Sequence, residues 1–237
     1  MTTITFDKLT VSLGGVTPVR SLTAEFAGRI NGVIGPNGAG KTTLLNVVSG
    51  FVRPAAGDVR LDGMSMIRLR SDRRARLGVG RTFQHIQLPD SITALENVRA
   101  GLDHHRQRAR LLAGEALEIC RFNGSPDTAT GELTGLQRRQ IELARAITSR
   151  PRALLLDEPT AGLAAGEVTL LRSVVAELPR RIGTTVVVVA HDLNLVRSIC
   201  DYAIALNFGE LLATGRPEVV LQNDRVRAAY LGIDDDE

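Results

Sequence analysis

The chain has 237 residues, of which 43% are hydrophobic and 23% are charged, as is typical of a globular protein built from one large domain or one domain with a subdomain. No apolar run approaches the roughly 18 residues of a membrane span and no signal-like segment opens the chain, so we expect any membrane role to depend on a partner. The net charge is only +3, and Cys120 and Cys200 form no spaced pair or cluster, so we expect reduced thiols in a cytosolic chain.

The N-terminal segment is predicted to form a small antiparallel β region. Residues 2–26 alternate weakly between apolar and polar side chains around a turn at Gly14 and Gly15. Residues 59–61 are expected to extend the same region.

The strongest signal in the sequence follows at residues 30–48. An apolar run, residues 30–34, leads into a glycine-rich loop, residues 35–42, and then into an apolar segment, residues 44–48. The loop GPNGAGKT fits the pattern G-x-x-x-x-G-K-[ST], whose backbone N–H groups surround a polyphosphate. The order of strand, glycine loop and helix therefore predicts a nucleotide-binding site.

Each position of this loop has a physical role. Gly35, Gly38 and Gly40 allow the positive φ angles that turn successive N–H groups inward. Lys41 supplies a point charge for the β and γ phosphates, and the Thr42 hydroxyl is a hard oxygen ligand for Mg²⁺. No lysine follows Lys41, which excludes a Ras-type GTPase because the base-recognition motif N/T-K-x-D is missing.

A basic run follows the β region. It consists of Arg70, Arg73, Arg74 and Arg76. Such a run could bind acidic lipid or nucleic acid, but a solvated helix face is the interpretation that we favour.

A helical insert is expected at residues 86–150, after a short strand that ends at residues 80–84. Residues 94–122 and 138–150 have a helical pattern, separated by a loop at residues 123–131. Thr93 with Glu96, and Thr134 with Gln137, have the spacing of capping boxes. His104 and His105 are expected to lie in a solvated stretch, because no acid or cysteine at ligand spacing supports a metal site there.

Two continuous apolar runs, residues 153–156 and 186–190, have the form of parallel strands that are covered on both faces. Strands that alternate with helices predict an α/β fold with a doubly wound parallel core and a helical insert. We expect a single domain, residues 1–237, in which residues 1–85 and 151–216 form the β region and core and residues 86–150 form a helical subdomain. Residues 217–237 are expected to be a C-terminal helix and an acidic tail.

Polar residues follow both apolar runs. Asp157 and Glu158 come after the first and His191 after the second, and ligand sites of parallel sheets lie at these carboxyl ends. We expect Asp157 to hold Mg²⁺, Glu158 to polarise the attacking water and His191 to contact the γ-phosphate.

With these motifs the chain resembles the ATP-binding subunits of ABC transporters over nearly its whole length. GPNGAGKTT resembles Walker A, Gln84 the Q-loop glutamine, LTGLQ the signature, ALLLDE Walker B and AGLA the D-loop, and His191 resembles the switch histidine. The resemblance implies the P-loop NTPase fold with a RecA-like core, and ATP with Mg²⁺ as cofactors.

The resemblance also implies the site residues. Those expected to contact ATP are Gly35, Asn37, Gly38, Ala39, Gly40, Lys41, Thr42 and Thr43 of Walker A, and Thr134, Gly135 and Gln137 of the signature. Those expected at Mg²⁺ are Thr42, Gln84 and Asp157. Those expected to act in catalysis are Glu158, His191, Gln84 and Lys41.

In this family two ATPase subunits hold two ATP molecules between Walker A of one and the signature of the other. The implied partners are therefore a second ATPase subunit, integral-membrane permease subunits and, indirectly, a periplasmic binding protein, with no nucleic acid. The implied location is the cytoplasmic face of the inner membrane. GVGRTFQHIQL, TALENV and RAAYLG resemble the uptake group for branched-chain amino acids, which also handles related hydrophobic amino acids, urea or short amides.

Three positions depart from the family pattern. Leu13 replaces the aromatic residue that stacks on adenine, Leu136 the second signature glycine, and Ala164 the D-loop Asp or Asn. Leu136 and Ala164 act across the dimer, which leads us to expect a heterodimer, with a homodimer as the other possibility. Alternative functions are a regulatory ABC subunit with weak hydrolysis, an export ATPase, and a soluble ABC ATPase that acts on nucleic acid.

Overall fold

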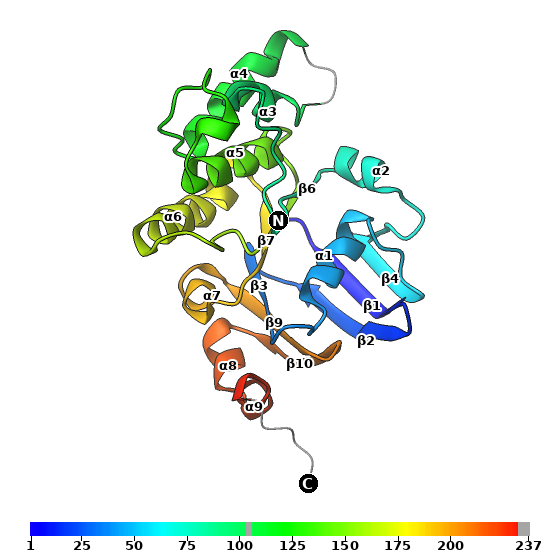
Figure 1. Ribbon diagram of the computed structural model, residues 1–237. Helices are drawn as coiled ribbons and strands as arrows, with labels where there is room; N and C mark the ends of the chain where they lie inside the picture. The colour runs from blue at the N-terminus through cyan, green and yellow to red at the C-terminus, as the bar shows by residue number, and fades with distance from the viewer. Residues whose placement is uncertain (103–105, 232–237) are drawn as a thin grey trace.

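A computed structural model describes residues 1–102 and 106–231, and it contains a central sheet of six strands (Figure 1). In spatial order these are β10 (Glu210–Gly215), β9 (Tyr202–Asn207), β3 (Ile30–Ile34), β8 (Thr185–Val189), β7 (Ala153–Asp157) and β6 (Val79–Arg81). Neighbouring strands are parallel except for the antiparallel pair of β9 and β10. The predicted α/β fold with a parallel core is confirmed.

The three central strands are apolar because both faces of the sheet are covered. Every residue of β3, β7 and β8 is buried. Val33, Leu155 and Val187 face one hydrophobic cluster, and Leu154 and Val186 face the other. Burying each such side chain contributes about 1.5–3 kcal/mol, so the edge at which these strands end is a rigid platform.

The predicted antiparallel β region is also confirmed. Strands β2 (Val16–Phe26), β1 (Ile4–Leu13), β4 (Ala56–Leu61) and β5 (Met64–Ser65) form a second sheet in this order, which lies beside helix α1 (Lys41–Ser49) in Figure 1. Leu44 and Val47 of α1 pack in one cluster with Ile4 of this sheet and Val33 of the central sheet. Helix α1 is therefore held between the two sheets.

The helical insert contains α3 (Ala94–Arg99), α4 (Arg106–Ile119), a 3₁₀ turn (Thr130–Glu132) and α5 (Gly135–Ile147). The expectation of a helical run through residues 94–122 was wrong, because α3 ends at Arg99. Gly101 lies so close to α5 that an added Cβ would approach the Arg145 carbonyl oxygen. The prediction for His104 and His105 falls outside the described residues.

Both predicted capping boxes are present. The Thr93 hydroxyl accepts from the Glu96 N–H at 3.2 Å, and the Thr134 hydroxyl accepts from the Gln137 N–H at 3.3 Å. The side chains of Glu96 and Gln137 accept in return from the backbone N–H of the capping threonine. Helices α3 and α5 therefore begin at residues that the sequence identifies.

Helix α2 (Ser71–Arg76) carries the basic run, and the solvated face predicted for it was wrong at one position. Arg73 and Arg76 are exposed, but Arg74 is buried. Its guanidinium donates to the carbonyl oxygens of Val47 and Val48 in the last turn of α1 and to that of Leu69. A buried arginine therefore caps the C-terminus of α1, where a positive charge is favourable.

The remaining helices are α6 (Ala165–Ile182), α7 (Leu193–Ile199), α8 (Pro217–Gln222) and α9 (Asp224–Leu231). Two short helices therefore stand where a single C-terminal helix was expected, and the acidic tail lies outside the described residues. Among the described helices, none is long and apolar enough to cross a membrane. Cys120 and Cys200 are both buried free thiols.

Candidate nucleotide-binding site

The loop between β3 and α1 has a backbone that glycine alone accommodates at its ends. Gly35 and Gly40 have φ angles of 147° and 98°. A Cβ at Gly35 would collide with the Leu206 carbonyl oxygen, and a Cβ at Gly40 would collide with that of Pro18. The loop is therefore fixed by β9 on one side and β2 on the other.

Lys41 begins α1 and bends back over this loop. Its ammonium donates to the carbonyl oxygens of Gly35 and Pro36, both at 2.7 Å. Burial lowers the pKa of Lys41, and the nearby carboxylates of Glu158 and Asp157 act in the opposite direction. The Lys41 ammonium is thus held at the centre of the loop, where it is able to bind an anion.

A cavity of about 500 Å³ opens in front of the loop. Its lining brings together segments that are far apart in the sequence: Leu13, Val16, Pro18, Asn37, Gly38, Ala39, Gly40, Lys41, Thr42, Thr43, Gln84, Glu158 and His191. Most of the predicted ATP contacts of Walker A and all four predicted catalytic residues therefore share one cavity. Its size and polar loop are suited to a nucleotide.

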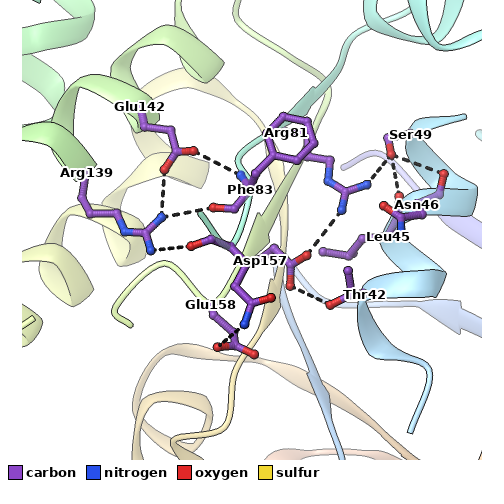
Figure 2. A network of polar contacts seen from close by, with 11 residues as sticks. Thr42, Leu45, Asn46, Ser49, Arg81, Phe83, Arg139, Glu142, Asp157 and Glu158 are labelled. Atoms are coloured by element: carbon purple, nitrogen blue, oxygen red, sulfur yellow. Dashed lines mark hydrogen bonds and ion pairs between the residues drawn. The ribbon is translucent and has the colours of Figure 1, made fainter. Parts of the chain in front are cut away.

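Asp157 lies at the end of β7, between Thr42 and Arg81 (Figure 2). One carboxylate oxygen accepts from the Thr42 hydroxyl at 3.2 Å, and the other lies 3.3 Å from a guanidinium nitrogen of Arg81. Burial raises the pKa of Asp157, whereas Arg81 and the Thr42 hydrogen bond lower it. A hydroxyl and a carboxylate side by side are the hard oxygen donors that Mg²⁺ prefers, so these residues fit the ion.

Glu158 contacts two of the other predicted catalytic residues, His191 and Gln84. One carboxylate oxygen lies 2.7 Å from Nε2 of His191, and the other accepts from the amide nitrogen of Gln84 at 3.4 Å. Glu158 has a φ of 48°, a conformation that costs about 1–3 kcal/mol in a residue other than glycine. Such strain is typical of functional positions, and it aims the carboxylate into the cavity.

The predicted signature residues lie elsewhere. Thr134, Gly135 and Gln137 are not among the described residues that line the cavity. Thr134 and Gly135 are exposed at the start of α5, and Leu136 is half-buried. The structure of one chain therefore does not bring the signature to Walker A.

Two of the three departures from the family pattern have a visible local effect. Leu13 and Val16 both line the cavity. Aliphatic side chains therefore occupy the place in which the family pattern has an aromatic residue that stacks on adenine. Ala164 is the N-cap of α6 and offers no side-chain acceptor, although its N–H donates to the Glu167 carboxylate at 2.9 Å.

Other residues near the site carried no role in the sequence interpretation. Arg81 contacts Asp157, and its guanidinium lies over the rings of Phe51 and Phe83. The Tyr230 hydroxyl accepts from the Gly35 N–H. Arg81 lies in GVGRTFQHIQL and Tyr230 in RAAYLG, two stretches that support the family resemblance but did not indicate a role for either residue.

Comparisons with known proteins agree with this geometry. A family model described as ABC transporter matches residues 21–161, and one described as branched-chain amino acid ATP-binding cassette transporter matches residues 210–236. The chain is 36% identical to the high-affinity branched-chain amino acid transport ATP-binding protein BraF of Pseudomonas aeruginosa, over 94% of this chain and 95% of that protein.

Two solved structures are also similar. The ADP conformation of MJ1267, an ATP-binding cassette of an ABC transporter, has a TM-score of 0.88 and 26% identity, over 98% of this chain and 99% of that one. A dimeric post-hydrolysis state of the cassette MJ0796, bound to ADP and phosphate, has a TM-score of 0.79 and 26% identity, over 90% and 98%.

Proposed function

The chain belongs to the ABC transporter family, and we propose that it is the ATP-hydrolysing subunit of an importer for branched-chain or related amino acids. The observation that carries this proposal is the cavity in which the glycine loop, Gln84, Glu158 and His191 meet. In this proposal residues 86–150 form the helical subdomain of the ATPase.

The loop residues hold the phosphates of ATP. The N–H groups of the turn and the start of α1 contact the phosphate oxygens, and the Lys41 ammonium exchanges its two carbonyl partners for them. Leu13 and Val16 line the mouth and give the base an apolar surface without a stacking ring.

Thr42, Asp157 and Gln84 would hold Mg²⁺, which would neutralise phosphate charge during hydrolysis. Arg81 keeps one oxygen of Asp157 fixed, and the other oxygen accepts from the hydroxyl of Thr42, a residue that lines the cavity.

Glu158 polarises the water that attacks the γ-phosphate. Nε2 of His191 lies 2.7 Å from one oxygen of the same carboxylate and the Gln84 amide donates to the other, so the two side chains fix the orientation of Glu158. Because Glu158 is only partly buried, water has access to it from the cavity.

The site is completed by a second ATPase subunit. The exposed start of α5, with the N–H groups of Gly135 and Leu136 ahead of the capped Gln137 N–H, forms an anion site for the ATP of the partner. The similar MJ0796 cassette is dimeric. We propose that permease subunits anchor this dimer at the cytoplasmic face of the membrane, because the similar protein BraF is a transport ATP-binding protein.

Branched-chain or related amino acids are proposed as the cargo because the C-terminal family model and the relative BraF agree. A second candidate, a regulatory subunit with weak hydrolysis, is favoured by Leu136 and Ala164. Both residues lie where the partner's site would be completed.

The test is ATP hydrolysis by the purified chain, alone and with a partner ATPase subunit, beside the same protein with Glu158→Gln. Hydrolysis that this substitution abolishes is the expected result. Nucleotide binding without turnover in every combination would contradict the ATPase assignment and favour the regulatory subunit. Uptake of branched-chain amino acids into vesicles that contain the permease would then test the cargo.

A further inference from the structure

Helix α5 carries a buried ion pair that contacts the backbone of the Gln84 segment (Figure 2). Arg139 and Glu142 lie one turn apart, 3.0 Å between the guanidinium and the carboxylate, with side chains only 7% and 2% exposed. Charged side chains are seldom this buried unless they have a structural or functional task.

The contacts of this pair converge on two successive residues. Arg139 donates to the carbonyl oxygens of Phe83 at 3.1 Å and Gln84 at 2.7 Å, and Glu142 accepts from the Phe83 N–H at 3.2 Å. We call Arg139 and Glu142 the α5 clamp. Because it binds main-chain atoms, it fixes the path of the chain rather than one side chain.

The α5 clamp contacts the chain at the point where it passes from the central sheet to the helical insert. The preceding residue Thr82 still donates to Leu155 of β7, so the segment leaves the central sheet at this point. The next backbone partners come from α5, in the helical insert. The amide of Gln84 then reaches Glu158 at 3.4 Å.

An ion pair is a poor means of simply attaching a helix to a loop. Removing two charges from water costs several kcal/mol, and apolar residues of similar size are often as stable. Burial raises the pKa of Glu142 despite the opposing effects of the Phe83 hydrogen bond and Arg139. The pair instead provides directional hydrogen bonds. It holds two backbone carbonyl oxygens and one backbone N–H of the Gln84 segment in one geometry.

We propose that Arg139 and Glu142 are positioning residues for the hydrolysis reaction, which tie Gln84 to helix α5. This inference rests on the proposed ATPase function. Helix α5 begins directly after Thr134, so Arg139 and Glu142 lie in the second and third turns of the helix that starts within the signature. A shift of that end of the helix therefore changes the placement of Gln84 beside Glu158.

The test variant is the double substitution Arg139→Met and Glu142→Gln, which removes the charges together and leaves no unpaired buried ion. Its matched control is Arg138→Met on the same helix, which removes an ion pair to Asp90 at 2.7 Å that does not touch the Gln84 segment. Circular dichroism verifies that both variants are folded.

The first readout needs no hydrolysis. The chain contains no tryptophan, so His85→Trp, at an exposed position next to Gln84, introduces a single fluorescent reporter. We expect the clamp variant to raise acrylamide quenching of this reporter and to lower its anisotropy, with no change in the control. Equal signals in the clamp variant and its parent would overturn the proposal.

The second readout is a double-mutant cycle on the hydrolysis rate with Gln84→Ala. We expect the clamp variant to lower kcat about tenfold when Gln84 is present and less than about twofold when it is absent. Effects that multiply would show that the pair acts independently of Gln84 and would overturn the proposal. If the parent protein hydrolyses no ATP with any partner, the proposed function fails. The fluorescence result alone then shows whether Arg139 and Glu142 fix the Gln84 segment.

Discussion

The Tyr230 hydroxyl, near the end of α9, accepts a hydrogen bond of 2.8 Å from the N–H of Gly35, the first glycine of the nucleotide-binding loop. The two residues are 195 positions apart, so this hydrogen bond joins helix α9 to the first residue of the nucleotide-binding loop. The Gly35 N–H is buried and needs an acceptor.

Tyr230→Phe removes that acceptor and little else. We expect a loss of about 1–3 kcal/mol in the free energy of unfolding, because the amide is left without its partner. ATP affinity should fall as well, since the loop begins at this residue. Urea unfolding and equilibrium ATP binding measure both effects, with Tyr202→Phe in β9 as the control. Equal losses in the two variants would contradict a specific role for Tyr230.

Arg81→Gln should destabilise the fold by about 3–5 kcal/mol, because it leaves Asp157 as an unpaired buried carboxylate. Arg81→Lys keeps the charge but loses the fork that also reaches the Ser49 hydroxyl at 2.6 Å, so a smaller loss is expected. Thermal unfolding of both variants checks this order. The double variant Asp157→Asn with Arg81→Gln should be more stable than Arg81→Gln alone if the unpaired carboxylate causes the loss of stability.

Ala164→Asp should stabilise the protein by about 1 kcal/mol, because α6 begins at a residue that has no side-chain cap. Ala161→Asp is the control, since it adds the same charge in the loop before the helix. Urea unfolding distinguishes the two. A similar gain from both substitutions would show that net charge, and not capping, is responsible.

Leu136→Gly should raise ATP hydrolysis at the site of the partner subunit if the bulky side chain obstructs it. The exchange should also cost up to about 1 kcal/mol of stability, because glycine is unfavourable in the first turn of α5. Mixed dimers with Glu158→Gln on one subunit at a time reveal which site gains. Equal loss of activity from either side would contradict a dimer with one strong and one weak site.

Glu142→Gln should change how stability depends on pH. Burial raises the pKa of Glu142 in the folded state, so the folded state binds this proton more tightly than the unfolded state, whose glutamate pKa is about 4.3. The contribution of Glu142 to stability is therefore full below that pH and is lost as the pH rises through the folded-state pKa. Relative to Glu142→Gln, the parent should lose stability with rising pH in this range, and urea unfolding at a series of pH values tests it.

Much of the site could be predicted because its residues lie in local patterns. The loop of Gly35 and Lys41 follows a buried strand, and Asp157, Glu158 and His191 stand at the ends of two more, so the sheet itself brings them together. Capping threonines likewise act on residues three positions away, and Thr134 was identified on that basis.

The contacts that were missed join segments without a local pattern. Arg74 resembles its exposed neighbours in sequence and is buried only because α2 packs at the end of α1. The break after α3 depends on how closely Gly101 approaches α5. Tyr230 and Arg81 meet their partners across 195 and 76 positions, distances over which periodicity carries no information.

Both native cysteines are poorly accessible to reagents. Cys120 is fully buried and Cys200 is 9% exposed, and burial raises both pKa values, that of Cys200 to about 12. At neutral pH both are protonated and shielded, and a shielded thiol reacts slowly with maleimides. A cysteine introduced at an exposed position such as Ala164 should therefore accept a spin label or a cross-linker selectively, so distances between two subunits are measurable without first removing the natural thiols.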